Sequence, residues 1–196
     1  MRADIEPGAK FPDFELTDHT GTRRRLSAIQ GKQPMIVVLS RGHFCPKDRR
    51  QLRNLVDFYP ELKVGYTQIV TISTDTVMET NEFRDALGAQ WMFLSDPRRT
   101  VQKDLDITEY TDPRHDPMIP HTLLLEPELR VFKVYNGYWY WGRPSVDDLR
   151  RDLREMFMKI RPDWDITDPE LQARWARGER DDFFPYPKFE GQEVAS

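Results

Sequence analysis

The sequence contains a single cysteine, Cys45, among its 196 residues. One cysteine excludes an internal disulfide framework and argues against a cysteine-rich zinc site. The longest aliphatic run, Met35 to Leu39, is far too short to cross a bilayer, and residues 1–14 lack the apolar core of a secretory signal. The chain also has no glycine-rich phosphate loop. We therefore expect a cytoplasmic protein, with no membrane partner, whose thiol has no internal partner.

The chain has no large excess of either charge, because its 29 basic and 33 acidic residues give a formal net charge of only −4. Such a balance gives no general attraction to nucleic acid or to an anionic membrane. No stripe of alternating basic and aromatic residues suggests nucleic-acid binding either. The one basic run, Arg23 to Arg25, is interpreted as a solvated turn.

Cys45 sits where an apolar strand gives way to a helix. Residues 35–39 form an uninterrupted β-branched run that is typical of a strand buried on both faces. The apolar spacing after Cys45 predicts a helix over 46–59 that ends at Pro60, and residues 68–72 predict a second buried strand. This order predicts two parallel strands with a right-handed crossover.

Residues that mark the starts and ends of helices and strands are easy to identify in the rest of the chain. Thr76 with Glu79, and Ser145 with Asp148, are typical capping boxes that open helices. Asp96 and Pro97 favour a further short helix. Four strands, one loop and one helix are also predicted, at the following ranges: strands 11–16, 91–94, 121–125 and 129–135, the loop 106–118, and a last helix 169–177. The last two strands are joined by a tight turn and are expected to be antiparallel.

The composition changes after Pro162, where aromatic and acidic residues become frequent. We expect one domain over residues 1–161 and a C-terminal arm over 162–196 that packs on the domain or on a partner. Five aromatic residues within 135–143 exceed what one strand face buries. Burial beneath the arm is the favoured interpretation, and an exposed partner surface is the other.

The flanks of Cys45 favour a reactive thiolate. The cysteine stands at a helix start and is followed by Pro46, and basic side chains surround it in the sequence. The alternative is a small buried hydrophobic residue at a strand end.

Several motifs in this order resemble the peroxiredoxins of the alkyl hydroperoxide reductase and thiol-specific antioxidant family. They are the opening around Phe11-Pro12-Asp13-Phe14, the strand leading into Cys45, the stretch Phe93-Leu94-Ser95-Asp96-Pro97, and Pro120-His121-Thr122. The resemblance covers roughly residues 5–160. It implies an α/β thioredoxin-like three-layer sandwich with a central mixed sheet, which agrees with the pattern of strands and helices.

The chain departs from this family near the cysteine. The positions where the family carries a proline and a threonine or serine hold Val38 and Gly42, and Pro120 aligns where it supplies an arginine. The string from Arg41 to Asp48 resembles a branch with Cys-Pro-x-Cys, in which Asp48 replaces the second cysteine. A disulfide exchange cycle within one Cys-x-x-Cys motif is therefore impossible.

The candidate site follows from these observations. Arg41, His43 and His121 are candidates for stabilising or deprotonating the thiol. Asp48 is a candidate proton acceptor, although an ordinary first-turn acid is favoured. Pro120 matches the cis proline that shapes the docking groove of the thioredoxin fold, with an ordinary trans proline as the alternative. Gly42 and Phe44 complete the substrate-binding set. The spacing of histidine, cysteine and acid matches no zinc pattern, so we expect neither metal nor cofactor.

Three functions remain open from the sequence. The first is a one-cysteine peroxidase with a hydroperoxide substrate and an external thiol reductant. The second is a monothiol disulfide exchange protein, and the third is a redox-inactive binding module with a thioredoxin fold. A homodimer is compatible with all three.

Overall fold

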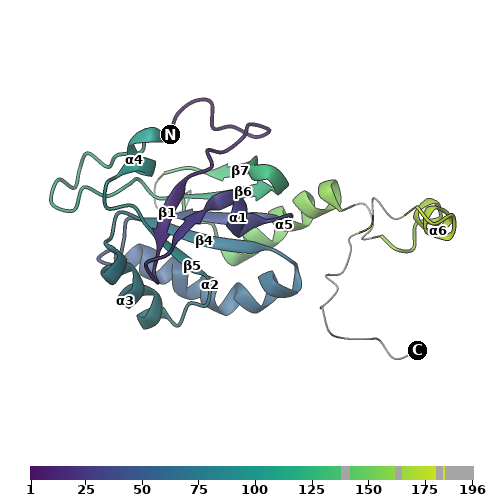
Figure 1. The fold of residues 1–196 in the computed structure, drawn as a ribbon, viewed down its shortest axis with the longest axis horizontal. Coiled ribbons are helices and arrows are strands. Elements are labelled where there is room, and N and C mark those ends of the chain that lie inside the picture. The colour runs from purple at the N-terminus through teal and green to yellow at the C-terminus, as the bar shows by residue number, and fades with distance from the viewer. Residues whose placement is uncertain (138–141, 162–164, 180–182, 184–196) are drawn as a thin grey trace. The chain divides into compact units, whose positions relative to one another are not determined.

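The computed structural model describes residues 1–137, 142–161, 165–179 and 183 (Figure 1). The chain forms two compact units, residues 1–150 and residues 151–196. The first unit contains a mixed sheet of seven strands in the order β2-β1-β5-β4-β3-β6-β7. The predicted α/β architecture with a central mixed sheet is confirmed.

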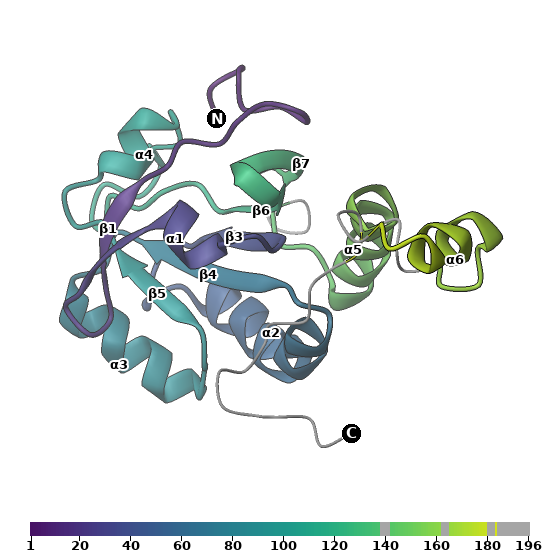
Figure 2. The same ribbon diagram turned by 45° about the vertical axis from the view of Figure 1, so that its right-hand side comes forward.

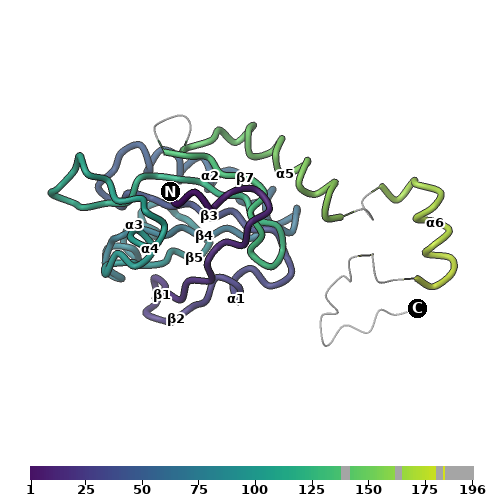
Figure 3. The backbone as a smooth tube through the Cα atoms, turned by 90° about the horizontal axis from the view of Figure 1, so that it is seen from above, coloured from purple at the N-terminus to yellow at the C-terminus, as the bar shows by residue number. Residues whose placement is uncertain are grey.

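Except for β2, the strands of this sheet follow the predicted apolar runs, with shifted ends. They are β1 (Glu15–Asp18), β2 (Arg23–Arg25), β3 (Met35–Leu39), β4 (Gln68–Ser73), β5 (Met92–Ser95), β6 (His121–Glu126) and β7 (Arg130–Tyr135). β3, β4 and β5 are parallel neighbours, as the tube in Figure 3 lets the reader follow. β6 is antiparallel to β3 and pairs Leu39 with His121, so the end of β3 that leads to Cys45 lies beside the start of β6.

Helices cover the sheet of the first unit, and the last helix belongs to the second unit. They are α1 (Leu26–Gln30), α2 (Pro46–Val64), α3 (Val77–Leu87), α4 (Thr100–Asp104), α5 (Val146–Ile160) and α6 (Pro169–Ala176), with a short 3₁₀ turn η1 (Pro127–Leu129). Figure 2 shows α2 and α3 together on one side of the sheet. This is the expected result of two successive right-handed crossovers made in the same direction.

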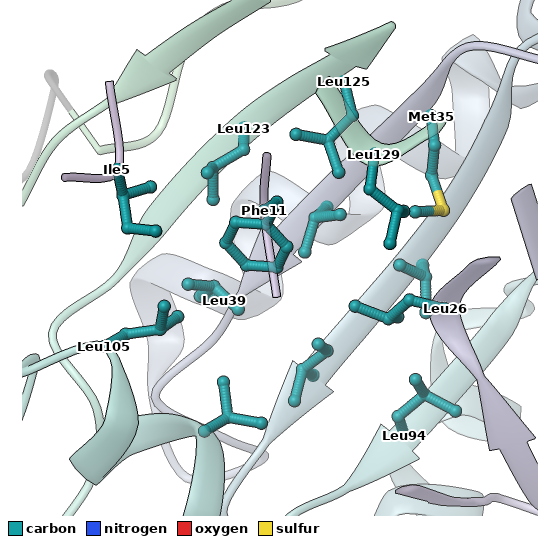
Figure 4. Packing of buried hydrophobic residues seen from close by; sticks show 14 of the residues in the cluster. Ile5, Phe11, Leu26, Met35, Leu39, Leu94, Leu105, Leu123, Leu125 and Leu129 are labelled. Atoms are coloured by element: carbon teal, nitrogen blue, oxygen red, sulfur yellow. The ribbon is translucent and has the colours of Figure 1, made fainter. Parts of the chain in front are cut away.

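The central strand β3 is buried at every position, which explains its uninterrupted apolar sequence. Met35, Val37 and Leu39 join the main apolar cluster, which also includes Leu26 of α1 and Val101 of α4. Phe11 lies in the middle of this cluster in Figure 4. The side chains between them in β3 face the opposite way because strand residues alternate. Both faces of the sheet therefore bury apolar side chains.

Two predictions of element ends are wrong. The helix after Cys45 continues through Pro60 to Val64. A proline inside a helix loses one backbone hydrogen bond, but the added turn buries Leu62, which favours continuation. The helix predicted at Asp96 begins later, at Thr100, although the Asp96 carboxylate still accepts the N–H groups of its first turn.

The basic run at residues 23–25 is a strand and not a turn. It pairs with β1, whose acidic residues accept two of the guanidinium groups: Arg23 binds Glu15 at 3.1 Å and Arg24 binds Asp18 at 2.9 Å. Oppositely charged neighbours across a strand pair stabilise it. The acidic residues at positions 13–18 indicate a paired strand, and an interpretation based on the basic run alone misses them.

The predicted capping boxes are confirmed. The Thr76 hydroxyl accepts the Glu79 N–H, and the Glu79 carboxylate accepts the Thr76 N–H in return. Ser145 and Asp148 make the same exchange at the start of α5. Each box satisfies N–H groups that have no partner within the helix. The predicted pair of antiparallel strands, β6 and β7, is also confirmed.

The second unit contains the continuation of α5 and α6. The Asp168 carboxylate caps α6 by accepting the Glu170 N–H at 2.9 Å, and the rings of Trp175 and Phe183 meet edge to face at 5.2 Å. Four of the five aromatic residues within 135–143 are at positions 138–141, which lie outside the described residues, as does Trp164. No described helix is both long enough and apolar enough to span a membrane.

Candidate active site at Cys45

Cys45 lies at the junction of β3 and α2. It is the N-cap residue of α2, and Pro46 occupies the first helical position, where the missing N–H of a proline costs no hydrogen bond. The Cys45 N–H donates to the Gly42 carbonyl oxygen at 3.1 Å. The cysteine is only 1% exposed. The few side chains that approach the sulfur therefore determine its chemistry.

Two guanidinium groups flank the thiol. Nη1 of Arg41 lies 4.0 Å from the Cys45 Sγ, and Nη2 of Arg143 lies 3.9 Å from it. Sequence reasoning identifies Arg41 and misses Arg143, which follows the cysteine by 98 residues. Positive charge at such distances favours the thiolate form of a cysteine. Arg143 thus supplies a guanidinium to the site, although this chain has Pro120 where the family pattern has an arginine.

Asp48 holds Arg143 in place. Its carboxylate forms an ion pair with Nε of Arg143, and it also accepts the Arg41 N–H at 2.6 Å and the Ser40 hydroxyl at 3.1 Å. The Asp48 side chain is 1% exposed, so it is not a solvated first-turn acid. No interaction with the Cys45 sulfur is found for it among the described residues. Its partners make it a positioning residue for both flanks of the thiol.

The backbone before Arg143 is held equally closely. The Gly142 carbonyl accepts the Thr122 hydroxyl at 3.0 Å. A Cβ on Gly142 would come within 2.5 Å of the Pro120 carbonyl oxygen and closer still to the Gly137 carbonyl. Only glycine permits such an approach. This packing brings the chain from the end of β7 back over the start of β6 and delivers Arg143 to the thiol.

The expectation of a cis proline is wrong. The Ile119–Pro120 peptide is trans, like every other peptide bond of the described chain. The trans form is preferred by about 0.5–1 kcal/mol before proline, and the close approach of Gly142 covers the Pro120 carbonyl. Pro120 is buried. Its backbone carbonyl therefore contacts the segment that carries Arg143.

Gly42 and His43 form the turn between β3 and the cysteine, and Asp75 fixes that turn. Gly42 has φ +118, and a Cβ there would lie 2.5 Å from the Asp75 carboxylate, which is why a hydroxyl-bearing residue does not fit. The same carboxylate accepts the His43 N–H at 2.9 Å and lies 2.9 Å from Nδ1 of the ring. His43 is thus directed toward Asp75, and no contact with the sulfur is found for it in the described chain.

His121 is close to the site in the sheet but is engaged elsewhere. Its Nδ1 lies 2.8 Å from the Ile119 carbonyl oxygen, and its Nε2 lies 2.8 Å from Oδ1 of Asn136. Burial lowers the pKa of His121, although these two hydrogen bonds oppose the effect. Because both ring nitrogens have partners, His121 has none to offer to Cys45.

The loop at residues 106–118 contacts the site through Arg41 and Phe44. Its Asp112 carboxylate binds Nη2 of Arg41 at 2.8 Å. The ring of His115 stacks on Phe44 with centroids 3.8 Å apart and planes 8° apart, and the Arg41 guanidinium lies 5.4 Å from the Phe44 ring centroid. Phe44 therefore links the loop to the turn before Cys45. The same ring also lies close to the Arg41 guanidinium.

The described residues contain one group of side chains with metal-ligand chemistry: His43, Asp75 and Glu79, whose ligand atoms lie within 4.8 Å of one another. The group does not include Cys45. These groups already have partners, because Asp75 accepts from His43 and from Ser73 and Glu79 caps its helix. The same contacts explain the cluster as part of the fold.

A cysteine at a helix start, just after the central strand of a mixed sheet and flanked by two guanidinium groups, defines a thioredoxin-like thiol protein. Comparison with known families assigns the chain to a particular family of such proteins. Residues 7–134 match the AhpC/TSA family. The chain therefore belongs to that family, which includes peroxiredoxins and thiol–disulfide oxidoreductases.

Curated relatives include both kinds of protein. Rv1608c of Mycobacterium tuberculosis, named as a peroxiredoxin, is 26% identical over 136 residues, which cover 68% of this chain and 86% of the relative. The thiol-disulfide oxidoreductase ResA of Bacillus subtilis is 24% identical over 137 residues, which cover 69% of this chain and 70% of the relative.

Solved structures have the same fold. Peroxidoxin BcpB from Mycobacterium tuberculosis gives a TM-score of 0.65 at 23% identity, covering 78% of this chain and 97% of its own. AhpC from Enterococcus faecalis gives a TM-score of 0.66 at 18% identity, covering 78% of this chain and 93% of its own. At these identities the likeness shows the thioredoxin-like fold, as predicted.

Proposed function

We propose that this protein is a thiol peroxidase in which Cys45 reduces a hydroperoxide and an external thiol then restores the cysteine. The observation that carries the proposal is the pair of guanidinium groups, each with a nitrogen within 4.0 Å of the Cys45 sulfur. Membership of the AhpC/TSA family supports it, and so does the likeness to a mycobacterial protein named as a peroxiredoxin.

In the oxidation step, the Cys45 thiolate attacks one oxygen of the hydroperoxide. The S–O bond forms as the O–O bond breaks, so the sulfur becomes a sulfenic acid and the peroxide is reduced to an alcohol, or to water. Negative charge moves from sulfur to the departing oxygen, which takes a proton from solvent. Arg41 and Arg143 stabilise the charge at both ends of this movement because their donors already point at the sulfur.

Ion pairs with carboxylates fix the orientation of both arginines. Each arginine uses one nitrogen toward the sulfur and another toward a carboxylate: Arg41 binds Asp112, and Arg143 binds Asp48. The carboxylates oppose thiolate formation by their charge, but they fix the guanidinium groups and remove the need to reorganise them during reaction. We infer that Asp48 acts by positioning and does not accept a proton.

The reduction step needs a thiol from outside the chain. The sequence contains no second cysteine, so the sulfenic acid of Cys45 has no internal thiol with which to condense. An external thiol displaces water and forms a mixed disulfide, and a second thiol releases Cys45. The likeness to ResA favours a second candidate, a monothiol disulfide exchange protein that enters the same cycle at the mixed disulfide.

Intact-mass measurement of one reaction cycle tests the proposal. The full-length protein is treated with one equivalent of hydrogen peroxide and then with 2-mercaptoethanol, with Cys45→Ser as the control. We expect the gain of one oxygen atom, then a mixed disulfide, then the original mass, with repeated turnover when both reagents are in excess. The Cys45→Ser variant should show none of these changes.

Two other outcomes would contradict the proposal. Slow oxidation by peroxide combined with a rapid exchange with glutathione disulfide would indicate the disulfide exchange protein. Reaction of Cys45 with neither reagent would leave a redox-inactive binding module.

A further inference from the structure

A cavity of about 420 Å³ lies beside the candidate active site. This volume falls within the usual range of small-molecule sites, roughly 300–1,000 Å³. One wall is a single face of α2, because the residues that line it are spaced three and four apart. The opposite wall is the turn that opens α5. The α2 wall consists of Lys47, Arg50, Gln51 and Asn54.

The charge of the cavity favours an anion. Lys47, Arg50 and Arg143 line it, whereas Asp148 is the one acidic side chain among the described lining residues. The Asp148 carboxylate is occupied at the helix start, where it accepts the N–H and the hydroxyl of Ser145. Arg50 is exposed and forms no ion pair within the described chain. A guanidinium without a carboxylate partner suits the binding of a ligand carboxylate.

Arg143 connects this cavity to the thiol. Its side chain lines the cavity, while its Nη2 lies 3.9 Å from the Cys45 sulfur. A hydrogen bond also holds the α2 wall of the cavity in place, because Nε2 of Gln51 donates to the Thr122 hydroxyl at 3.0 Å. A molecule bound between Arg50 and Arg143 would therefore contact the same side chain that approaches the sulfur.

We propose that the cavity binds a small thiol that carries carboxylate groups, and that this thiol is the reductant of oxidised Cys45. The inference rests on the proposed function, because only an oxidised Cys45 requires a reductant. The incoming thiol forms an S–S bond with Cys45 and its proton leaves with the hydroxyl as water. A second molecule of the same thiol attacks the mixed disulfide and releases the Cys45 thiol together with a symmetric disulfide.

A kinetic comparison of two reducing thiols tests this assignment. Sulfenic Cys45 is prepared with peroxide, and its reduction is followed with mercaptosuccinate, which is anionic, and with 2-mercaptoethanol, which is neutral. Wild type, Arg50→Glu and Arg53→Glu are compared. Arg53 is exposed on the same helix and does not line the cavity. The ratio of the two rates removes effects that a variant has on both thiols.

We expect Arg50→Glu to lower the ratio of the mercaptosuccinate rate to the 2-mercaptoethanol rate by about tenfold at low ionic strength. Reversing the charge of Arg50 removes an attraction to the carboxylates of mercaptosuccinate and adds a repulsion, and both effects are strongest at low ionic strength. Arg53→Glu should leave the ratio unchanged. Equal changes in the two variants would mean that the electrostatic field of the whole protein attracts the anionic thiol, and not the cavity. An unchanged ratio in Arg50→Glu would overturn the proposal.

Equilibrium binding separates this proposal from the peroxidase itself. Mercaptosuccinate is titrated into the full-length Cys45→Ser protein, with and without Arg50→Glu. Saturable binding that Arg50→Glu weakens supports the cavity assignment even if Cys45 fails to react with peroxide. Absence of binding at millimolar concentration would overturn it while leaving the peroxidase proposal intact. If Arg50→Glu instead slows only the oxidation of Cys45 by a fatty acid hydroperoxide, the cavity serves the oxidant and the reductant proposal is wrong.

Discussion

The two flanks of Cys45 place a guanidinium at nearly the same distance from the sulfur but support it in different ways. On one flank, Arg41 is 22% exposed and binds Asp112, which is 20% exposed, at the edge of the 106–118 loop. On the other, Arg143 is 8% exposed and binds Asp48, which is 1% exposed. The first flank depends on a partly solvated surface network and the second on a buried ion pair.

This difference sets the expected cost of disturbing each flank. Removing one partner from a buried pair leaves an uncompensated charge and costs about 3–5 kcal/mol, whereas a solvated pair contributes about 1 kcal/mol or less and weakens with salt. The buried flank should therefore hold its geometry more firmly, and the loop flank should respond more readily to conditions.

The largest effect is expected for Asp48→Ala. The substitution leaves Arg143 buried without its carboxylate and removes an acceptor from the Arg41 N–H. We expect the free energy of unfolding to fall by about 3 kcal/mol, as measured by urea denaturation. Asp57→Ala is the control, since Asp57 is exposed on the same helix, and it should change stability by about 0.5 kcal/mol or less. Similar losses in the two variants would contradict the assigned role of Asp48.

Arg143→Lys should have the next largest effect, and we expect it mainly on the rate of Cys45 oxidation and less on stability. A lysine keeps the positive charge but cannot direct separate nitrogens at Asp48 and at the sulfur. We expect the rate of Cys45 oxidation by hydrogen peroxide to fall on the order of 10²-fold, as for other losses of a positioned donor. Arg150→Lys is the control, because Arg150 forms exposed ion pairs with Glu61 and Asp147. A normal rate in Arg143→Lys would show that the buried flank is not needed.

Asp112→Asn should disturb the loop flank less. It removes the charge that holds Nη2 of Arg41, but the Arg41 N–H remains bound to Asp48. We expect about a fivefold decrease in the oxidation rate at low ionic strength, because an ion pair open to solvent contributes little. Added salt should shrink the difference between wild type and variant, because it screens the exposed pair. A difference that persists at high salt would indicate that this flank is effectively buried.

The smallest effect is expected in the pH dependence of stability. Partial burial opposes ionisation of Asp112, but hydrogen bonds from His115 and the charge of Arg41 outweigh it and lower the Asp112 pKa below its ordinary 3.8. The unfolded chain then binds a proton more readily than the folded protein does, so the stabilisation is present above that value and is lost as the pH falls below it. Urea denaturation between about pH 5 and pH 2 should show a shallower decline for Asp112→Asn.

Local signals predict the elements around the thiol well. The β-branched run of β3, the proline after Cys45 and both capping boxes each depend on residues close together in sequence, and the structure contains all of them. Pro60 is the counterexample, since a local helix breaker is overridden by the burial of Leu62 in the next turn.

The second half of the site could not be predicted in the same way. Arg143 reaches the sulfur through the packing of Gly142 against residues 120 and 137, which no local pattern expresses. The pair Gly142-Arg143 just before a capping box is the one signal that sequence reasoning could have used. Asp48 illustrates the same limit, because its position in the first helical turn gives no sign that its carboxylate turns inward to three partners.

The most direct measurement is the rate constant for oxidation of Cys45 by hydrogen peroxide in the native protein, compared with the same thiol in the urea-unfolded chain. If the two guanidinium groups activate the thiol, the native rate should exceed the unfolded rate on the order of 10²-fold. A native rate equal to or below the unfolded rate would mean that burial merely protects Cys45, and would contradict the account.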